Sequence, residues 1–396
     1  MVGQAEVNIG LIGHVDHGKT SITKLLSGKW TDTHSEELKR GISIRLGFAD
    51  TTFYVCDKCK EYSTSAKCSC GGKTKMLRQV SFVDAPGHET LMATMLSGAT
   101  IMDGALLIIA ANEECPQPRT KEHLMAVKMA GVENIIVVQN KIDLVSKEKA
   151  MENYEQIKIF LKETGFENVP IVPLSANLGI NKSALIKTIE EIIITPKHKA
   201  EGKLFMLVVR SFDINKPGDK INSMIGGVLG GTIIRGTVKI GDKIEIGPVD
   251  KPLVTKVISL RTEKGKLDVA RPGGLIAVGT ELDPALTYND SMKGKVVGEE
   301  GSLPDAVNQM TLEVTSFERE LMKFDKPIKV SEPLVLTIGT GTNLGIVAGI
   351  KGNTIKVNLK LSAVAEKGQK IAISRNIGSG WSLYGYGIYN WDSSRY

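Results

Sequence analysis

Residues 13–20 read Gly-His-Val-Asp-His-Gly-Lys-Thr, which fits the pattern G-x-x-x-x-G-K-[ST]. A strand-like run, VNIGLIG, precedes this loop, and a helix-like run begins at Lys19. This order turns a helix N-terminus and several backbone N–H groups toward a polyphosphate. The residues concerned are Asp16, His17, Gly18, Lys19, Thr20 and Ser21. Lys19 is expected to reach the β- and γ-phosphates, and the Thr20 hydroxyl to ligate Mg²⁺.

Asp16 is an unusual residue for such a loop. A carboxylate among phosphates repels the ligand unless a cation lies between them. Asp16 therefore either faces solvent or helps to hold a second Mg²⁺.

A second group of residues follows the strand-like run QVSFV, where the chain reads Asp84-Ala85-Pro86-Gly87-His88. Asp84, at a strand end, can hold Mg²⁺ through water, and Gly87 lets the backbone approach a γ-phosphate. His88 is expected to position the attacking water. Earlier in the chain, Ser43 in the stretch RGISI offers another hydroxyl to Mg²⁺. Taken alone, that stretch would be interpreted as a short apolar strand with one buried serine.

Base recognition is expected from Asn140-Lys141-Ile142-Asp143, which closes the strand-like run IIVVQ. The Asp143 carboxylate can accept N1–H and N2–H of guanine, whereas adenine has no matching pair of donors. Asn140 would brace the loops and the Lys141 stem would cover the base. Backbone N–H groups of Ser175, Ala176 and Asn177 would bind the guanine O6. Four such motifs at strand ends predict that the nucleotide is GTP or GDP.

Four cysteines lie close together in a Cys-x₂-Cys-x₈-Cys-x-Cys pattern: Cys56, Cys59, Cys68 and Cys70. Thiolates at such short spacing favour tetrahedral Zn²⁺, although only Ser69 separates the second pair. The alternative is a reduced or partly occupied knuckle. Cys115 is too distant to be a ligand and is expected to be a half-buried apolar residue.

The elements that carry these motifs alternate between buried parallel strands and helices over residues 1–200. Helices are expected to begin near Lys19, His88, Thr120, Lys147 and Asn181. After the polar segment TPKHKAEGK the chain changes to short strands broken by glycine, with a further break at GSLPDAVN. We therefore predict an α/β P-loop GTPase domain with a doubly wound, mostly parallel sheet over residues 1–200. Two β-barrel domains are expected to follow, over residues 201–306 and 307–396.

Composition narrows the class of protein further. Of 396 residues, 42% are hydrophobic and 24% are charged, which excludes a mostly disordered chain. The longest apolar stretch falls far short of the ~20 residues that span a bilayer, and we expect a cytoplasmic protein without membrane contact. Residues 307–396 carry 11 Lys or Arg against 7 Asp or Glu. This excess indicates either a polyanionic partner or an ordinary lysine-rich surface.

The motifs GHVDHGKT, RGISI, DAPGH, NKID and SAN, followed by two barrels, resemble the translational GTPases of the elongation factor Tu type. Within that group, the cysteine knuckle before DAPGHETLMATMLSGATIMDGALLIIAANE is similar to that of the archaeal-type initiation factor 2 gamma subunits. The barrel phrases RSFDINKPG, GGVLGGTI, PGGLIAVGTELDP and AISRNIG are similar too, so the resemblance covers essentially the whole chain.

The resemblance implies a GTP-dependent carrier of initiator methionyl-tRNA to the small ribosomal subunit, which releases the tRNA on GTP hydrolysis. It implies a heterotrimer, with an alpha subunit docked on the second domain and a beta subunit on the GTPase domain. Without an arginine placed as a stabiliser in the switch segments, we expect slow hydrolysis in the absence of the ribosome or another factor.

The resemblance also implies how metal ions are held. One Mg²⁺ would be bound by the hydroxyls of Thr20 and Ser43, with Asp84 behind a water molecule. A second ion would lie near Asp16 and the Gly41 carbonyl.

Other family features concern the switch segments and the chain end. Val15 and Ile42 stand where the family has an apolar gate over the histidine at position 88. Ser43 stands where threonine is usual, so a methyl group is lost. The run from Gly378 to Ser382 lacks the arginines expected there.

Two other functions fit the same motifs. One is a different aminoacyl-tRNA carrier of the same build, such as a selenocysteine-specific elongation factor, against which the knuckle and the lack of a fourth domain argue. The other is a GTPase subunit that regulates a metabolic enzyme without any RNA partner. Salt-sensitive RNA binding would exclude this last function.

Overall fold

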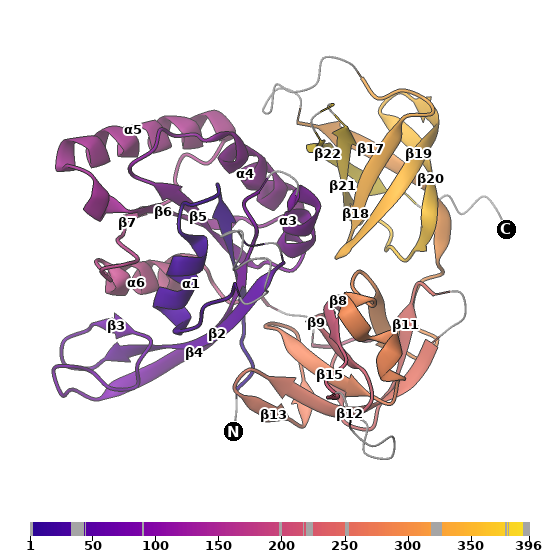
Figure 1. Cartoon of the computed structure of the whole chain (residues 1–396), viewed down its shortest axis with the longest axis horizontal. Coiled ribbons are helices and arrows are strands. Elements are labelled where there is room, and N and C mark those ends of the chain that lie inside the picture. The colour runs from indigo at the N-terminus through magenta and orange to yellow at the C-terminus, as the bar shows by residue number, and fades with distance from the viewer. Residues whose placement is uncertain are drawn as a thin grey trace. The chain divides into compact units, whose positions relative to one another are not determined.

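The computed structural model describes residues 3–32, 43, 45–88, 91–197, 200–216, 218, 225–249, 253–317, 327–376, 378 and 380–390 (Figure 1). The chain divides into two compact units, Ala5–Pro196 and Lys197–Tyr396, the latter joined by Met1–Gln4. The break between them lies in the polar segment TPKHKAEGK. Gly41 and Ile42, for which the resemblance implies metal-binding and gating roles, lie outside the described residues.

The first unit is built on one seven-stranded sheet with the order β3-β2-β4-β1-β5-β6-β7. Its strands are β1 (Asn8–Gly13), β2 (Gly47–Cys56), β3 (Tyr62–Ser63), β4 (Thr74–Asp84), β5 (Gly104–Ala110), β6 (Asn134–Asn140) and β7 (Ile171–Pro173). The five strands from β4 to β7 in this order are parallel, as predicted. β2 and β3 add an antiparallel edge that was not predicted, because the Ala-Asp-Thr-Thr run in β2 breaks the apolar pattern.

Helices cover both faces of this sheet (Figure 1). They are α1 (Lys19–Ser27), α3 (Met92–Ala99), α4 (Pro118–Ala130), α5 (Lys147–Thr164) and α6 (Lys182–Ile192). The helix expected near His88 is α3, which begins at Met92, and residues 85–88, which include Pro86 and Gly87, are non-helical. α4 begins at Pro118, two residues before the predicted Thr120, since proline suits the first helical position.

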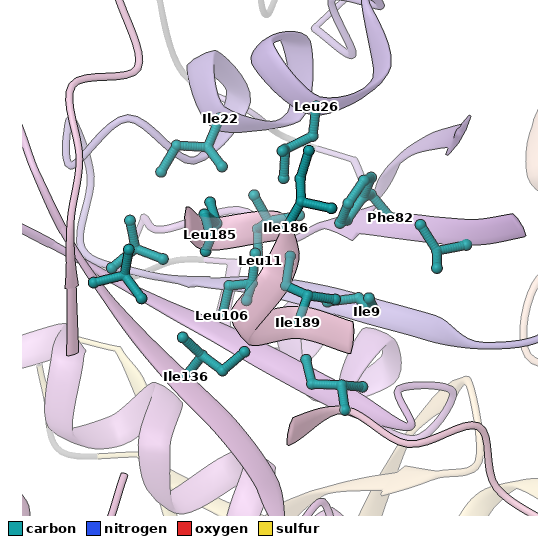
Figure 2. Close-up of a cluster of buried hydrophobic side chains, with 14 of the residues drawn as sticks. Ile9, Leu11, Ile22, Leu26, Phe82, Leu106, Ile136, Leu185, Ile186 and Ile189 are labelled. Atoms are coloured by element: carbon teal, nitrogen blue, oxygen red, sulfur yellow. The ribbon is translucent and has the colours of Figure 1, made fainter. Parts of the chain in front are cut away.

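The core between the sheet and α1 and α6 is made of fully buried aliphatic and aromatic side chains (Figure 2). Ile22 and Leu26 of α1 and Leu185, Ile186 and Ile189 of α6 pack on Ile9, Leu11, Phe82, Leu106 and Ile136 of the strands. This packing fixes both helices against the sheet, and the loops that follow β1, β4, β6 and β7 therefore meet at one edge.

The second unit contains two β-barrels, as predicted. The first is closed by the order β11-β16-β8-β9-β15-β12 with pairing of β11 to β12. Its strands are β8 (Phe205–Phe212), β9 (Val228–Arg235), β10 (Val238–Lys239), β11 (Lys243–Gly247), β12 (Leu253–Thr262), β13 (Gly265–Leu267), β14 (Val269–Ala270), β15 (Ile276–Thr280) and β16 (Val296–Glu299). β12, β13, β14 and β16 were not predicted, because β12 mixes polar and apolar residues on both of its sides and the other three strands are short.

The second barrel closes in the order β17-β20-β19-β18-β21-β22. Its strands are β17 (Val307–Ser316), β18 (Pro333–Ile338), β19 (Gly341–Lys351), β20 (Thr354–Ala363), β21 (Lys370–Asn376) and β22 (Trp381–Tyr389). Each barrel has its own interior of buried apolar residues. Across the described parts of the chain, none of the helices combines the length and the apolar character needed to cross a bilayer.

Candidate nucleotide site

The loop at residues 13–20, here called the phosphate loop, runs from β1 into α1. It turns through left-handed backbone at Asp16 (φ 61°) and Gly18 (φ 93°). The Lys19 ammonium lies inside the loop, where Nζ donates to the carbonyl oxygens of Gly13 at 3.0 Å and His14 at 2.7 Å. Burial lowers the pKa of Lys19 to about 8. A buried cation aimed into a loop of backbone N–H groups suits a polyphosphate.

Hydroxyls and carboxylates meet beside the phosphate loop, at the end of β4. Thr20 Oγ1 donates to Asp84 Oδ2 at 2.8 Å and lies 3.3 Å from Ser43 Oγ. Thr31 Oγ1 also donates to Asp84 Oδ2, at 2.6 Å. Asp84 Oδ1 is buried without a hydrogen-bond partner in the described structure, and burial raises the pKa of this carboxyl to about 6. A buried carboxylate oxygen beside two hydroxyls fits the all-oxygen ligand set that Mg²⁺ prefers.

A cavity of about 200 Å³ opens over these groups. It is lined by Val15, Asp16, Gly18, Lys19, Thr20, Ser21, Trp30, Asp32, Ser43, Gly87, His88 and Lys141. Most of the predicted phosphate, metal and catalytic residues thus meet in one place. His88 and Asp16 are exposed, whereas Gly87 is buried against the phosphate loop. A Cβ atom added to Gly87 would lie 2.6 Å from Lys19 Nζ, so no larger residue fits there without movement.

Asn140 joins two of the predicted loops. Its Nδ2 donates to the His17 carbonyl oxygen at 2.9 Å, and its Oδ1 accepts from the Ala176 backbone N–H at 3.1 Å. The bracing role predicted for Asn140 therefore has a geometric basis in both directions. Lys141 reaches the cavity, whereas Asp143 and Asn177 are exposed and are not among its lining residues. Ser175 is fully buried, and its Oγ accepts from the Leu178 backbone N–H.

Several residues at this site were not predicted. Trp30 and Asp32 line the cavity and Thr31 binds Asp84, and their only sequence signal is their position just after α1. His123 of α4 accepts a hydrogen bond from the Gly13 backbone N–H at 3.1 Å. No local pattern around His123 announces that contact. The His17 side chain points into the protein instead of the cavity, with Nδ1 2.9 Å from the Ile108 carbonyl oxygen.

The cysteines form a separate cluster at the far end of the β2–β4 hairpin. Their four sulfur atoms all lie within 4.8 Å of one another, with 3.4 Å between Cys68 and Cys70. Tetrahedral Zn²⁺ with Zn–S bonds of about 2.3 Å requires sulfurs about 3.8 Å apart, so the cluster fits zinc despite the short second pair. A hydrogen bond from the Cys59 backbone is the main cause that lowers the pKa of the Cys56 thiol to about 6. Cys115 is half-buried elsewhere.

The phosphate loop runs from a strand into a helix at one edge of a doubly wound sheet, beside a carboxylate and hydroxyls and a loop braced by Asn140. This arrangement defines the class as a P-loop GTP-binding protein, here with two β-barrels that follow it. Residues 4–195 match the family described as elongation factor Tu GTP binding domain, and residues 226–298 match elongation factor Tu domain 2. Residues 308–389 match initiation factor eIF2 gamma, C terminal.

Relatives of full length are named translation initiation factor 2 subunit gamma. The protein of Methanococcus maripaludis strain S2 is 54% identical over 403 residues, covering 97% of this chain and 98% of its own length. That of Methanocaldococcus jannaschii is 53% identical, with 97% of each chain covered. The chain therefore belongs to the family of translation initiation factor 2 gamma subunits, and it is a GTPase.

Solved structures with the same fold include a bacterial selenocysteine-specific elongation factor, with a TM-score of 0.77 and 26% identity. The match covers 97% of this chain but 58% of that one. Elongation factor SelB of Methanococcus maripaludis, in complex with a GTP analogue, has a TM-score of 0.75 at 22% identity, with coverage of 99% of this chain and 80% of its own. At 22% identity, the similarity to SelB shows only that the two proteins share a fold.

Proposed function

We propose that this protein carries initiator methionyl-tRNA to the small ribosomal subunit in its GTP-bound state and releases the tRNA after GTP hydrolysis. The observation that carries the proposal is the Asn140 bridge, which links the phosphate loop to the loop at residues 175–177 through two hydrogen bonds of the buried Asn140 side chain. Full-length similarity to initiation factor gamma subunits supports the choice of tRNA.

Phosphates would bind along the backbone N–H groups from Asp16 to Ser21, with Lys19 turning from its loop carbonyls to the β- and γ-phosphates. Asp143 would accept the two guanine N–H donors, under the stem of Lys141. Ser175, Ala176 and Asn177 would receive the guanine O6 through their backbone N–H groups.

Metal ligands would be Thr20 and Ser43 directly and Asp84 through water, with Asp16 and the Gly41 carbonyl at a second ion. The buried Oδ1 of Asp84, which has no hydrogen-bond partner among the described residues, supports this assignment. Mg²⁺ bound here supplies positive charge that neutralises the β- and γ-phosphate oxygens.

For hydrolysis, the Gly87 backbone would approach the γ-phosphate and His88 would orient the attacking water. No arginine lines the cavity among the described residues, and such a group contributes on the order of 10³–10⁵ in rate. We therefore expect the isolated chain to hydrolyse GTP far more slowly than once per second. Turnover of several per second by the chain alone would contradict this.

The cysteine knuckle would hold Zn²⁺ through Cys56, Cys59, Cys68 and Cys70 as a closed structural site. The partners proposed are the alpha and beta subunits of the same factor, initiator methionyl-tRNA and the small ribosomal subunit. A role in translation initiation would place the protein in the cytoplasm.

The deciding experiment measures protection of the methionyl-tRNA ester bond from hydrolysis. Initiator and elongator methionyl-tRNA are compared with GTP and with GDP, in the presence and absence of a partner alpha subunit. We expect protection of initiator methionyl-tRNA with GTP and not with GDP. Equal protection of both tRNAs would favour an elongation-type carrier. No protection with intact GTP binding would favour a regulatory GTPase subunit.

A further inference from the structure

The cysteine knuckle is held to helix α6 by two side-chain hydrogen bonds. The Tyr62 backbone N–H donates to Ser183 Oγ at 2.9 Å, and Lys182 Nζ donates to Thr64 Oγ1 at 2.9 Å. Tyr62 and Thr64 belong to the short segment between Cys59 and Cys68. α6 accordingly packs against β3 (Figure 1). The first turn of α6 thus binds the segment between Cys59 and Cys68 through these two hydrogen bonds.

The N-terminal end of α6 also supports the loop at residues 175–180. Asn181, the residue before α6, donates from Nδ2 to the Pro173 carbonyl oxygen at 2.9 Å. The Ser175 backbone N–H donates to the Ile180 carbonyl oxygen at 3.4 Å. Ala176 packs on the same apolar core as Tyr62. The loop proposed to receive guanine O6 is therefore anchored at the start of α6.

From that loop the contacts continue to the phosphate loop through Asn140, which binds the Ala176 N–H and the His17 carbonyl. Lys182 is half-buried, and this burial lowers the pKa of its ammonium. A partly desolvated ammonium with a hydrogen bond is costly to displace, so the Lys182–Thr64 contact is a specific tether.

We infer that Ser183 and Lys182 are positioning residues, which transmit the order of the metal-loaded cysteine knuckle to the loop that receives the guanine base. The inference rests on the proposed function for the assignment of guanine to that loop. Without its metal the segment between Cys59 and Cys68 gains conformational freedom, because its two ends are no longer held together by a shared ion. The hydrogen bonds between this segment and α6 then weaken, and the 175–177 loop becomes less ordered as a result.

The test uses the full chain with its zinc content measured, loaded with a fluorescent GDP analogue. Removal of the metal by a chelator is expected to speed release of the analogue about fivefold, a typical size for coupling between such sites. Release of a fluorescent GTP analogue should speed up by the same factor, because GDP and GTP carry the same base. Unchanged release after chelation would overturn the inference. Failure of the zinc-loaded chain to hold GDP at all would instead overturn the proposed nucleotide site.

Matched variants separate positioning from general loss of structure. The double variant Lys182→Met with Ser183→Ala should keep its zinc and release GDP about fivefold faster, and chelation should then add nothing. Lys187→Met, on an exposed part of the same helix, should behave as the wild type. Hydrogen exchange at residues 175–178 should speed up in the double variant with zinc bound. A double variant that still responds fully to chelation would contradict the tether.

Discussion

The backbone N–H of Gly13 donates a hydrogen bond to Nδ1 of His123, across 3.1 Å and 110 residues of sequence. Only a neutral imidazole can accept at Nδ1. Burial, followed by the charges of Lys19 and Arg119, holds the pKa of His123 well below its usual range. The first residue of the phosphate loop is therefore tied to helix α4 by a histidine that must stay uncharged.

Acid should destabilise the nucleotide-free protein. The pKa values of His14, His17 and His123 are all lowered by burial, so below about pH 6.5 these three side chains bind more protons in the unfolded chain than in the native one, an effect that the raised pKa of Asp84 offsets only in part, because it is one group against three. The free energy of unfolding is therefore expected to fall as the pH decreases from about 6.5. Urea denaturation at several pH values measures this. In the variant His123→Asn, the Asn Oδ1 can accept the hydrogen bond in place of Nδ1, so the free energy of unfolding should depend less steeply on pH. Parallel pH curves for the variant and the wild type would contradict this expectation.

Asn140→Ala removes both ends of a buried bridge, leaving the Ala176 N–H and the His17 carbonyl without a partner. Each unpaired buried group costs about 1–3 kcal/mol. The affinities for GDP and GTP should both fall by about 10- to 100-fold, as measured by equilibrium fluorescence titration. Asn134→Ala, at the opposite end of β6, is the control that should leave both affinities unchanged. A loss for GTP alone would mean that Asn140 acts on the γ-phosphate side.

Gly87→Ala should separate hydrolysis from binding. Its new Cβ would lie 2.6 Å from Lys19 Nζ and 2.9 Å from the Val15 backbone nitrogen, so the 84–88 segment must withdraw from the phosphate loop. Ribosome-stimulated GTP hydrolysis should fall at least about tenfold, because this segment acts in the transition state. GDP affinity should change less than about threefold. Gly349→Ala, where nothing lies within 4 Å of the added Cβ, serves as the control.

Asp84→Asn should stabilise the empty protein while it impairs metal-dependent binding. The pKa of Asp84 is raised by burial to about 6, above its ordinary value of 3.8. The ionised carboxylate therefore opposes folding at neutral pH, by up to about 1–3 kcal/mol. Thermal unfolding without nucleotide should shift upward in the variant. The Mg²⁺ dependence of GTP affinity should weaken in the same protein, and a lower melting temperature would contradict the first expectation.

Much of the nucleotide site was predictable, because each motif is contiguous and its spacing carries its chemistry. The 13–20 loop, Asp84 with Gly87, and Asn140 with Lys141 each lie within one short segment of sequence. The parallel strands and both barrels were confirmed, and so was the family. Zinc at the knuckle, the domain limits and the individual site roles stay predictions.

Other features depended on the folded chain. β2 and β12 lack a continuous apolar run and become strands only through pairing with neighbours. Three hydrogen bonds join residues that are 53 to 121 positions apart in the sequence. They link Gly13 to His123, Thr31 to Asp84, and Tyr62 of the knuckle to Ser183 of α6. Sequence spacing within a segment sets which groups can face one ligand. Hydrogen bonds between distant segments exist only once packing of the core has chosen which loops meet.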